Sequence, residues 1–133
     1  MARGALEGKI ISDDASKAQA YIASRNNYTR CNQAAKETAG MVLTYNGKCA
    51  STYYSHSNGG RTYSCKEVWG QDKPYLIARS DEWTRAEKHG HGIGLSQVGA
   101  IYAGANGIKF QDILEFYYPG TTLMKLNIEE LNY

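Results

Sequence analysis

Residues 88–100 read KHGHGIGLSQVGA, with glycine at positions 90, 92 and 94 around the histidines His89 and His91. Glycine adopts left-handed backbone conformations that other residues avoid, and it lets another backbone or a ligand come close to the chain. A purely structural loop rarely needs glycine at alternate positions beside two imidazoles. The stretch therefore predicts a functional loop, followed by a helix over residues 96–105 with Gly104 or Gly107 beyond its end.

A β-hairpin is predicted earlier in the chain. Residues 41–45 (MVLTY) and 48–54 (KCASTYY) flank Asn46-Gly47. This dipeptide is the strongest short-range signal for a two-residue hairpin turn, because both central positions of that turn require a positive φ.

The remaining pattern predicts further short elements. Ser12 can cap a helix over residues 13–29, and residues 75–78 (YLIA) are typical of a strand. A second C-terminal helix, stopped by Pro119-Gly120, would bury one apolar face, and residues 121–126 would form a closing strand. The apolar positions of that helix are Phe110, Ile113, Leu114 and Tyr117. Helices and strands do not alternate regularly, so the pattern indicates a mixed α+β fold.

Composition narrows the class of protein. The chain has 133 residues, 42% apolar and 21% charged, which fits one compact domain spanning residues 1–133. A net charge of +2, with lysine and arginine scattered along the chain, argues against a nucleic-acid partner. No apolar run approaches a membrane span, and no apolar segment precedes a small-residue cleavage site, so we expect neither insertion nor a secretion signal in this chain.

Five motifs occur in the chain at residues 42–48 (VLTYNGK), 54–60 (YSHSNGG), 68–70 (VWG), 90–100 (GHGIGLSQVGA) and 113–121 (ILEFYYPGT). Their types and order resemble the SpoIID/LytB family, which is named for a sporulation protein that acts as a lytic transglycosylase of peptidoglycan and includes proteins described as amidase enhancers. The resemblance extends from about residue 34 to residue 124, apart from residues 78–87. The resemblance implies a shortened SpoIID-like α+β domain with the hairpin, several further short strands and three to four helices around a glycan groove.

The resemblance also implies a catalytic residue. Residues 17–20 (KAQA) and 23–25 (ASR) are similar to a helix that follows the family's catalytic glutamate, and Glu7 lies upstream where that glutamate is expected. Arg25 and Lys17 correspond to the arginine and lysine of this helix, with Lys17 one residue out of register. Arg25 would hold a substrate carboxylate or N-acetyl group or stabilise developing charge.

One carboxyl group is sufficient for the implied reaction. In a lytic transglycosylase the C6 hydroxyl of the sugar attacks its own anomeric carbon, so the same group acts first as acid and then as base. Glu7 needs a raised pKa for this role, which burial beside Ala5 and Leu6 would supply. The alternative interpretation is a solvated acidic residue close to the N-terminus.

Other residues of the motifs are candidates for binding glycan. Tyr54 offers an apolar face with a hydroxyl edge for a sugar ring. His91 either contacts substrate, assists proton transfer or braces its loop by hydrogen bonds to the 57–60 turn. Ser96 either caps the helix that follows or meets sugar hydroxyls. The predicted substrate-binding set is Arg25, Lys17, Tyr54, Ser57, Gly59, Gly60, His91, Ser96 and Gln97.

Three cysteines, Cys31, Cys49 and Cys65, cannot all pair within the chain. Some members of the family are associated with zinc held by cysteine and histidine near the hairpin. A structural zinc here would use His56 and Cys65 first, yet neither belongs to a Cys-x-x-Cys pair, so the fold would have to assemble the site. The alternative is a half-buried strand cysteine beside surface histidines. No cofactor is required for the predicted reaction.

Three functions follow as hypotheses. The first is a lytic transglycosylase that cleaves between N-acetylmuramic acid and N-acetylglucosamine and leaves 1,6-anhydro ends. The second is a non-catalytic peptidoglycan-binding module that enhances a separate cell-wall amidase, and the third is a zinc-stabilised interaction domain. The first two place the chain in the cell envelope or outside the cell, a localisation inferred from the substrate alone.

Overall fold

The computed structural model describes residues 28–126, and the helix predicted over residues 13–29 lies outside them except for its last two positions. The chain divides into two compact units, one of which is Leu43–Leu123. The other contains the remainder, of which Tyr28–Val42 and Met124–Leu126 are described. That the chain forms a single domain stays a prediction.

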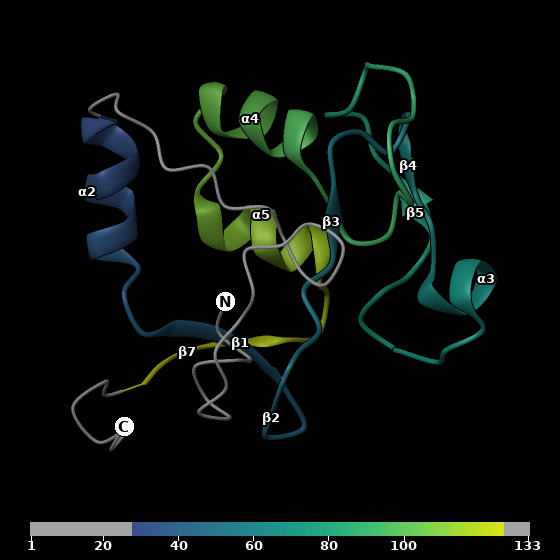
Figure 1. Cartoon of the computed structure of the whole chain (residues 1–133), viewed down its shortest axis with the longest axis horizontal. Helices are drawn as coiled ribbons and strands as arrows, with labels where there is room; N and C mark the ends of the chain where they lie inside the picture. The colour runs from purple at the N-terminus through teal and green to yellow at the C-terminus, as the bar shows by residue number, and fades with distance from the viewer. Residues whose placement is uncertain (1–27, 127–133) are drawn as a thin grey trace, which may run out of the picture. The chain divides into compact units, whose positions relative to one another are not determined.

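Within the described residues the fold is mixed α+β, as predicted, with four helices and seven short strands (Figure 1). The helices are α2 (Thr29–Glu37), α3 (Cys65–Trp69), α4 (Gln97–Ala105) and α5 (Phe110–Tyr117). The strands are β1 (Met41–Tyr45), β2 (Lys48–Cys49), β3 (Tyr54–Ser55), β4 (Arg61–Thr62), β5 (Arg79–Ser80), β6 (Leu95–Ser96) and β7 (Thr122–Lys125).

The predicted hairpin is present, but its second strand is shorter than predicted. β1 and β2 pair antiparallel, with Tyr45 opposite Lys48, and the turn between them has φ +49° at Asn46 and +73° at Gly47. These two positive angles are the backbone signature of a type I′ turn. After Cys49 the chain leaves β1, whose other neighbour in the three-stranded sheet is β7.

Tyr54 and Ser55 belong to a different sheet from the hairpin. They form β3, which pairs parallel with β6 in the register Tyr54–Leu95 and Ser55–Ser96. Since β6 directly follows the glycine-histidine loop, residues 88–94, this pairing places that loop beside the Tyr54–Gly60 loop.

The prediction of a strand over residues 75–78 is wrong. Tyr75 and Leu76 lie in a turn and are buried in the core, and the neighbouring strand is β5. The Tyr75 hydroxyl accepts a hydrogen bond from the Ser51 N–H at 2.8 Å, and the Leu76 carbonyl accepts one from the Cys65 N–H at 3.1 Å. Side-chain burial, not strand pairing, explains this apolar run.

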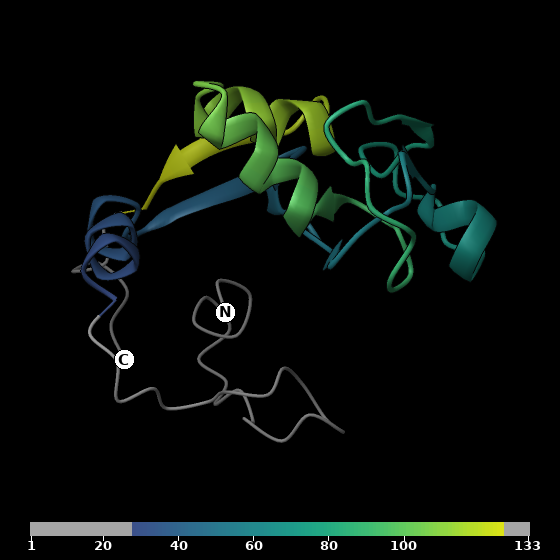
Figure 2. The ribbon, with the colours of Figure 1, turned by 90° about the horizontal axis from the view of Figure 1, so that it is seen from above.

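The two C-terminal helices form where predicted and lie side by side in the Leu43–Leu123 unit (Figures 1 and 2). Ser96 is the N-cap of α4, accepting from the Gly99 N–H at 3.3 Å. α5 buries Ile113 and Tyr117, whereas Phe110, predicted on the same face, is 41% exposed in its first turn. α5 ends at Tyr117, before Pro119-Gly120 as predicted.

Two short helices are present that the sequence pattern did not predict. α2 buries none of its residues; Gln33 Nε2 donates to Glu37 Oε1 at 2.8 Å, and the C-cap Thr38 Oγ1 donates to the Ala34 carbonyl at 2.8 Å. α3 begins with a complete capping box, in which the Ser64 hydroxyl accepts from the Glu67 N–H and the Glu67 carboxylate accepts from the Ser64 N–H. The Ser-x-x-Glu signal for α3 was therefore readable in the sequence.

Candidate functional site

The glycine-histidine loop, residues 88–94, is held along both sides by hydrogen bonds to the backbone of the Leu43–Leu123 unit. His89 and Ser57 exchange two hydrogen bonds, at 2.9 and 3.2 Å. Further along, the Tyr63 N–H donates to the Gly92 carbonyl at 2.9 Å, and the Leu95 N–H donates to the Tyr53 carbonyl at 3.1 Å. The loop is thus a tightly bonded part of the fold.

The alternate glycines are needed because the loop lies very close to its neighbours. Gly92 and Gly94 have φ of +74° and +68°. A Cβ at Gly92 would lie 2.6 Å from Cδ2 of Tyr63, and one at Gly94 would overlap the Tyr53 carbonyl oxygen. The close approach predicted from the glycine pattern is found, and the approaching group is the protein itself.

His91 braces the loop from inside its turn. Its Nδ1 accepts a hydrogen bond from the Ile93 N–H at 2.9 Å, so a neutral ring carries its proton on Nε2. Partial burial lowers the pKa of His91, with a smaller contribution from the charge of Lys88, and the Tyr54 carbonyl opposes both. His91 thus braces its own turn through Ile93, whereas the bonds to the 57–60 turn that were predicted for it are made by the backbone of His89 with Ser57. Contact of His91 with substrate stays a prediction.

We expect His91 to make stability depend on pH. In the unfolded chain the imidazole takes a proton as the pH falls through about 6.5, while the folded ring stays neutral to lower pH. The contribution of His91 to the free energy of unfolding should therefore be fully present above pH 6.5 and should decrease as the pH falls below that value. Urea unfolding at pH 5 to 7.5 should show this slope, and His91→Gln should reduce it. An NMR titration midpoint for His91 at or above 6.5 would contradict the expectation.

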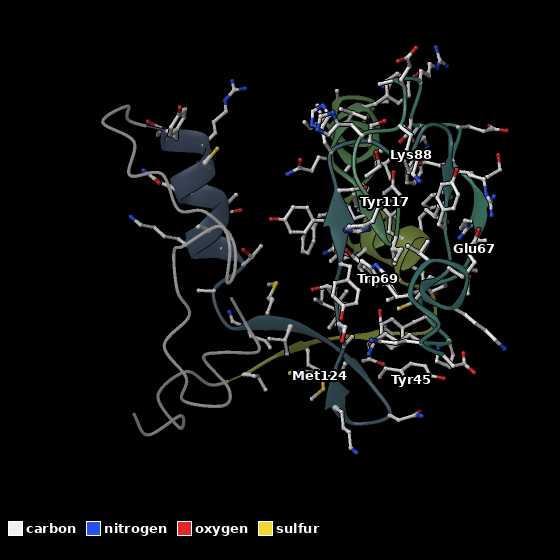
Figure 3. All side chains as sticks on the ribbon, turned by 45° about the vertical axis from the view of Figure 1, so that its right-hand side comes forward. Tyr45, Glu67, Trp69, Lys88, Tyr117 and Met124 are labelled. Atoms are coloured by element: carbon white, nitrogen blue, oxygen red, sulfur yellow. The ribbon has the colours of Figure 1, made fainter. Side chains whose placement is uncertain are left out.

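His91 also belongs to an exposed aromatic cluster. The Trp69 ring, 42% exposed, lies 5.0 Å from the His91 ring and 5.0 Å from the Tyr53 ring, measured between centroids. Tyr54, predicted to contact a sugar, is 40% exposed on β3. Aromatic faces presented to solvent suit the apolar face of a pyranose ring. Trp69 belongs to one of the five motifs but is not among the predicted site residues, and its position at the end of α3 is what presents it here (Figure 3).

A buried carboxylate beneath these loops has no counterpart among the predicted site residues. Asp81 is 1% exposed, and its Oδ2 accepts from Asn58 Nδ2 at 2.7 Å, Thr84 Oγ1 at 2.7 Å and the Tyr117 hydroxyl at 2.8 Å. Its Oδ1 accepts from the Trp83 N–H at 3.0 Å. Burial and the Asp81 hydrogen bond raise the pKa of Tyr117, whose side chain lies inside the unit (Figure 3). One carboxylate therefore ties the 57–60 turn to α5.

The same network reaches α4 through Ser96. Because the single Thr84 hydroxyl proton is donated to Asp81, the Ser96 hydroxyl, 2.8 Å from Thr84 Oγ1, acts as the donor of that pair. Ser96 Oγ also caps α4. Asp81 could not be recognised in the sequence because no motif or spacing distinguishes it from the exposed residues around it.

The structure separates the predicted binding residues by exposure. Ser57 and Ser96 are fully buried and hydrogen-bonded within the protein, so in this conformation they support the loops. Gly59 is exposed and Gly60 is half-buried in the 57–60 turn, and Gln97 is exposed at the first position of α4. Glu7, Lys17 and Arg25 lie outside the described residues, so the catalytic assignment stays a prediction.

The predicted zinc ligands are not grouped into a site within residues 28–126. Cys65 is fully buried in the hydrophobic core, and exposed His56 has its ring 5.5 Å from that of His89. Over these residues no three histidine, cysteine, aspartate or glutamate side chains are arranged to hold a metal ion. Zinc binding by His56 and Cys65 stays a prediction. Nor does this part of the chain contain a helix long and apolar enough to cross a membrane.

Comparison with known proteins supports the resemblance over part of the chain. No protein-family model matches the sequence. A segment of 50 residues, 38% of this chain, is 50% identical to the protein named amidase enhancer from Bacillus subtilis (strain 168). The segment covers 7% of that protein, so the chain corresponds to a small part of the relative it matches.

Proposed function

We propose that this chain is a peptidoglycan-binding module that enhances the activity of a separate cell-wall amidase. The observation that carries the proposal is the 50% identity over 50 residues to a protein named amidase enhancer. The exposed Trp69 ring, 5.0 Å from the ring of His91, and the exposed Tyr54 side chain on β3 are the aromatic groups that would meet a glycan strand. The module would act in the cell envelope or outside the cell, where peptidoglycan lies.

The test measures amidase activity on purified peptidoglycan with and without this protein. We expect the protein to raise the rate at which a cell-wall amidase releases stem peptides and to co-sediment with glycan strands. An unchanged amidase rate, with glycan strands bound or not, would overturn the enhancer proposal.

Trp69→Ala should weaken co-sedimentation with glycan about tenfold, because it removes the largest exposed ring of the cluster while leaving the buried core intact. Tyr102→Ala is the matched control: this ring is 39% exposed on α4, outside the cluster, and its loss should leave binding unchanged. Equal effects of the two substitutions would argue against a glycan surface at Trp69.

A second candidate function, lytic transglycosylase activity, is favoured by the position of Glu7 before residues 17–25 and by the five motifs. Mass spectrometry of digested peptidoglycan separates it from the first. Anhydro-muramic products released by the wild type and absent with Glu7→Gln would establish the enzyme, with Glu7 as its acid. Amidase enhancement that survives Glu7→Gln without such products would leave the binding module alone.

A further inference from the structure

Two cationic side chains lie over the Tyr63 ring, and only one of them is paired with a carboxylate in the described residues. Arg61 Cζ lies 4.4 Å and Lys88 Nζ 4.1 Å from the centroid of the ring. The Arg61 guanidinium is paired with the Glu67 carboxylate at 2.9 Å. Among residues 28–126 no carboxylate lies within ion-pair distance of Lys88. Lys88 therefore presents a positive charge that the described part of the protein does not neutralise.

The backbone around Lys88 holds it in place. Its neighbour His89 exchanges two hydrogen bonds with Ser57. Gly59 is so close that a Cβ there would lie 3.0 Å from the Lys88 Cβ, and Lys88 Cε passes 3.3 Å from the Cβ position of Gly92. An exposed lysine usually loses much side-chain entropy when it binds a ligand, and a stem held between these glycines and Tyr63 loses less.

Lys88 and Trp69 are linked through the same loop. Lys88 Cε lies 3.3 Å from where a Cβ would stand at Gly92, next to His91, and the Lys88 charge contributes to the lowered pKa of that histidine. The His91 ring in turn lies 5.0 Å from Trp69. Figure 3 labels both Lys88 and Trp69 in this unit. The loop around His91 and Gly92 thus lies next to an exposed indole, suited to a sugar ring, and to an ammonium group that no carboxylate of residues 28–126 neutralises.

We propose that Lys88 binds a carboxylate carried by a sugar of the bound strand, so that this surface selects an acidic glycan over a neutral one. The proposal rests on the proposed glycan binding and adds the residue that determines specificity. An ammonium group matches this task because it forms a charge-assisted hydrogen bond to one carboxylate oxygen, while the indole accepts the apolar face of the ring.

The experiment compares three kinds of strand in equilibrium binding. The first is glycan stripped of stem peptides, in which muramic acid keeps its ring-linked carboxylate; the second is the same glycan with those carboxyl groups reduced to alcohols. The third is intact glycan with stem peptides. We expect the wild type to bind the stripped acidic strand about tenfold more tightly than the reduced strand, with a preference that weakens at high salt.

Lys88→Met should abolish this preference, and Lys88→Arg should retain most of it. Lys109→Met is the control, because it removes one exposed charge at the N-cap of α5 and should keep the preference. Unchanged thermal unfolding of Lys88→Met separates loss of specificity from loss of fold.

Equal binding of acidic and reduced strands by the wild type would overturn the role of Lys88 and leave the proposed function standing. Preference only for strands with stem peptides would overturn it as well, since the carboxylate read would then belong to the peptide. If the protein binds none of the three strands, both the role of Lys88 and glycan binding itself are overturned.

Discussion

Asp81→Ala is expected to destabilise the protein by about 4 kcal/mol, because it removes the common acceptor of three buried side-chain donors. Asn58, Thr84 and Tyr117 would each keep a polar group in the interior with its main partner gone. Chemical denaturation, followed by tryptophan fluorescence, measures the change. Tyr117→Phe, which removes one donor and leaves the carboxylate with its other partners, should cost about 1 kcal/mol.

The matched control is Asp72→Ala. Asp72 is exposed, so its loss should change stability by less than about 0.5 kcal/mol. If Asp81→Ala unfolds at nearly the same denaturant concentration as the wild type, the carboxylate is not a structural centre of this unit. Such a result would mean that water replaces it without loss.

Gly94→Ala is expected to cost about 3 kcal/mol, the sum of backbone strain at φ +68° and overlap with the Tyr53 carbonyl oxygen. That oxygen cannot move away cheaply. It accepts from the Leu95 N–H at 3.1 Å and from the Tyr118 hydroxyl at 2.7 Å, so displacing it breaks two hydrogen bonds.

Gly47→Ala isolates the strain from the overlap. Gly47 has a similar φ of +73°, but a Cβ there would meet nothing within 4 Å. Its substitution should cost about 1 kcal/mol, from strain alone. Equal losses for Gly94→Ala and Gly47→Ala, measured by thermal unfolding, would show that the Tyr53 carbonyl yields to the new methyl group.

The predictable parts of the fold are those that depend on local sequence. Asn46-Gly47 specified the hairpin turn, and Ser96 specified the start of α4, because both are recognised by bonds within a few residues. The prediction of a strand over residues 75–78 was wrong for the opposite reason, because it depended on contacts that are not local. An apolar run does not reveal whether its backbone bonds to a strand or its side chains simply fill a core.

The candidate site shows the same limit. The glycine and histidine spacing correctly predicted a tightly approached loop, but not what approaches it. Trp69 and Lys88 are candidates for the site because Trp69 contacts His91 and Lys88 lies over the Tyr63 ring. Asp81 matters to the fold because it accepts hydrogen bonds from Asn58 and Tyr117. These neighbours are distant in the chain, so no local pattern could predict their contacts.

The parallel pairing of β3 with β6 has a consequence for the order of folding. Tyr54 and Leu95 are separated by α3, β4 and β5, so their pairing requires closure of a long loop of chain. The hairpin of β1 and β2 needs no such closure. The backbone amides of His89 and Leu95, which bond across the closed loop, therefore gain protection from hydrogen exchange only after that closure. A nascent or truncated chain that ends before residue 95 contains Tyr54 but lacks β6, the strand with which Tyr54 pairs.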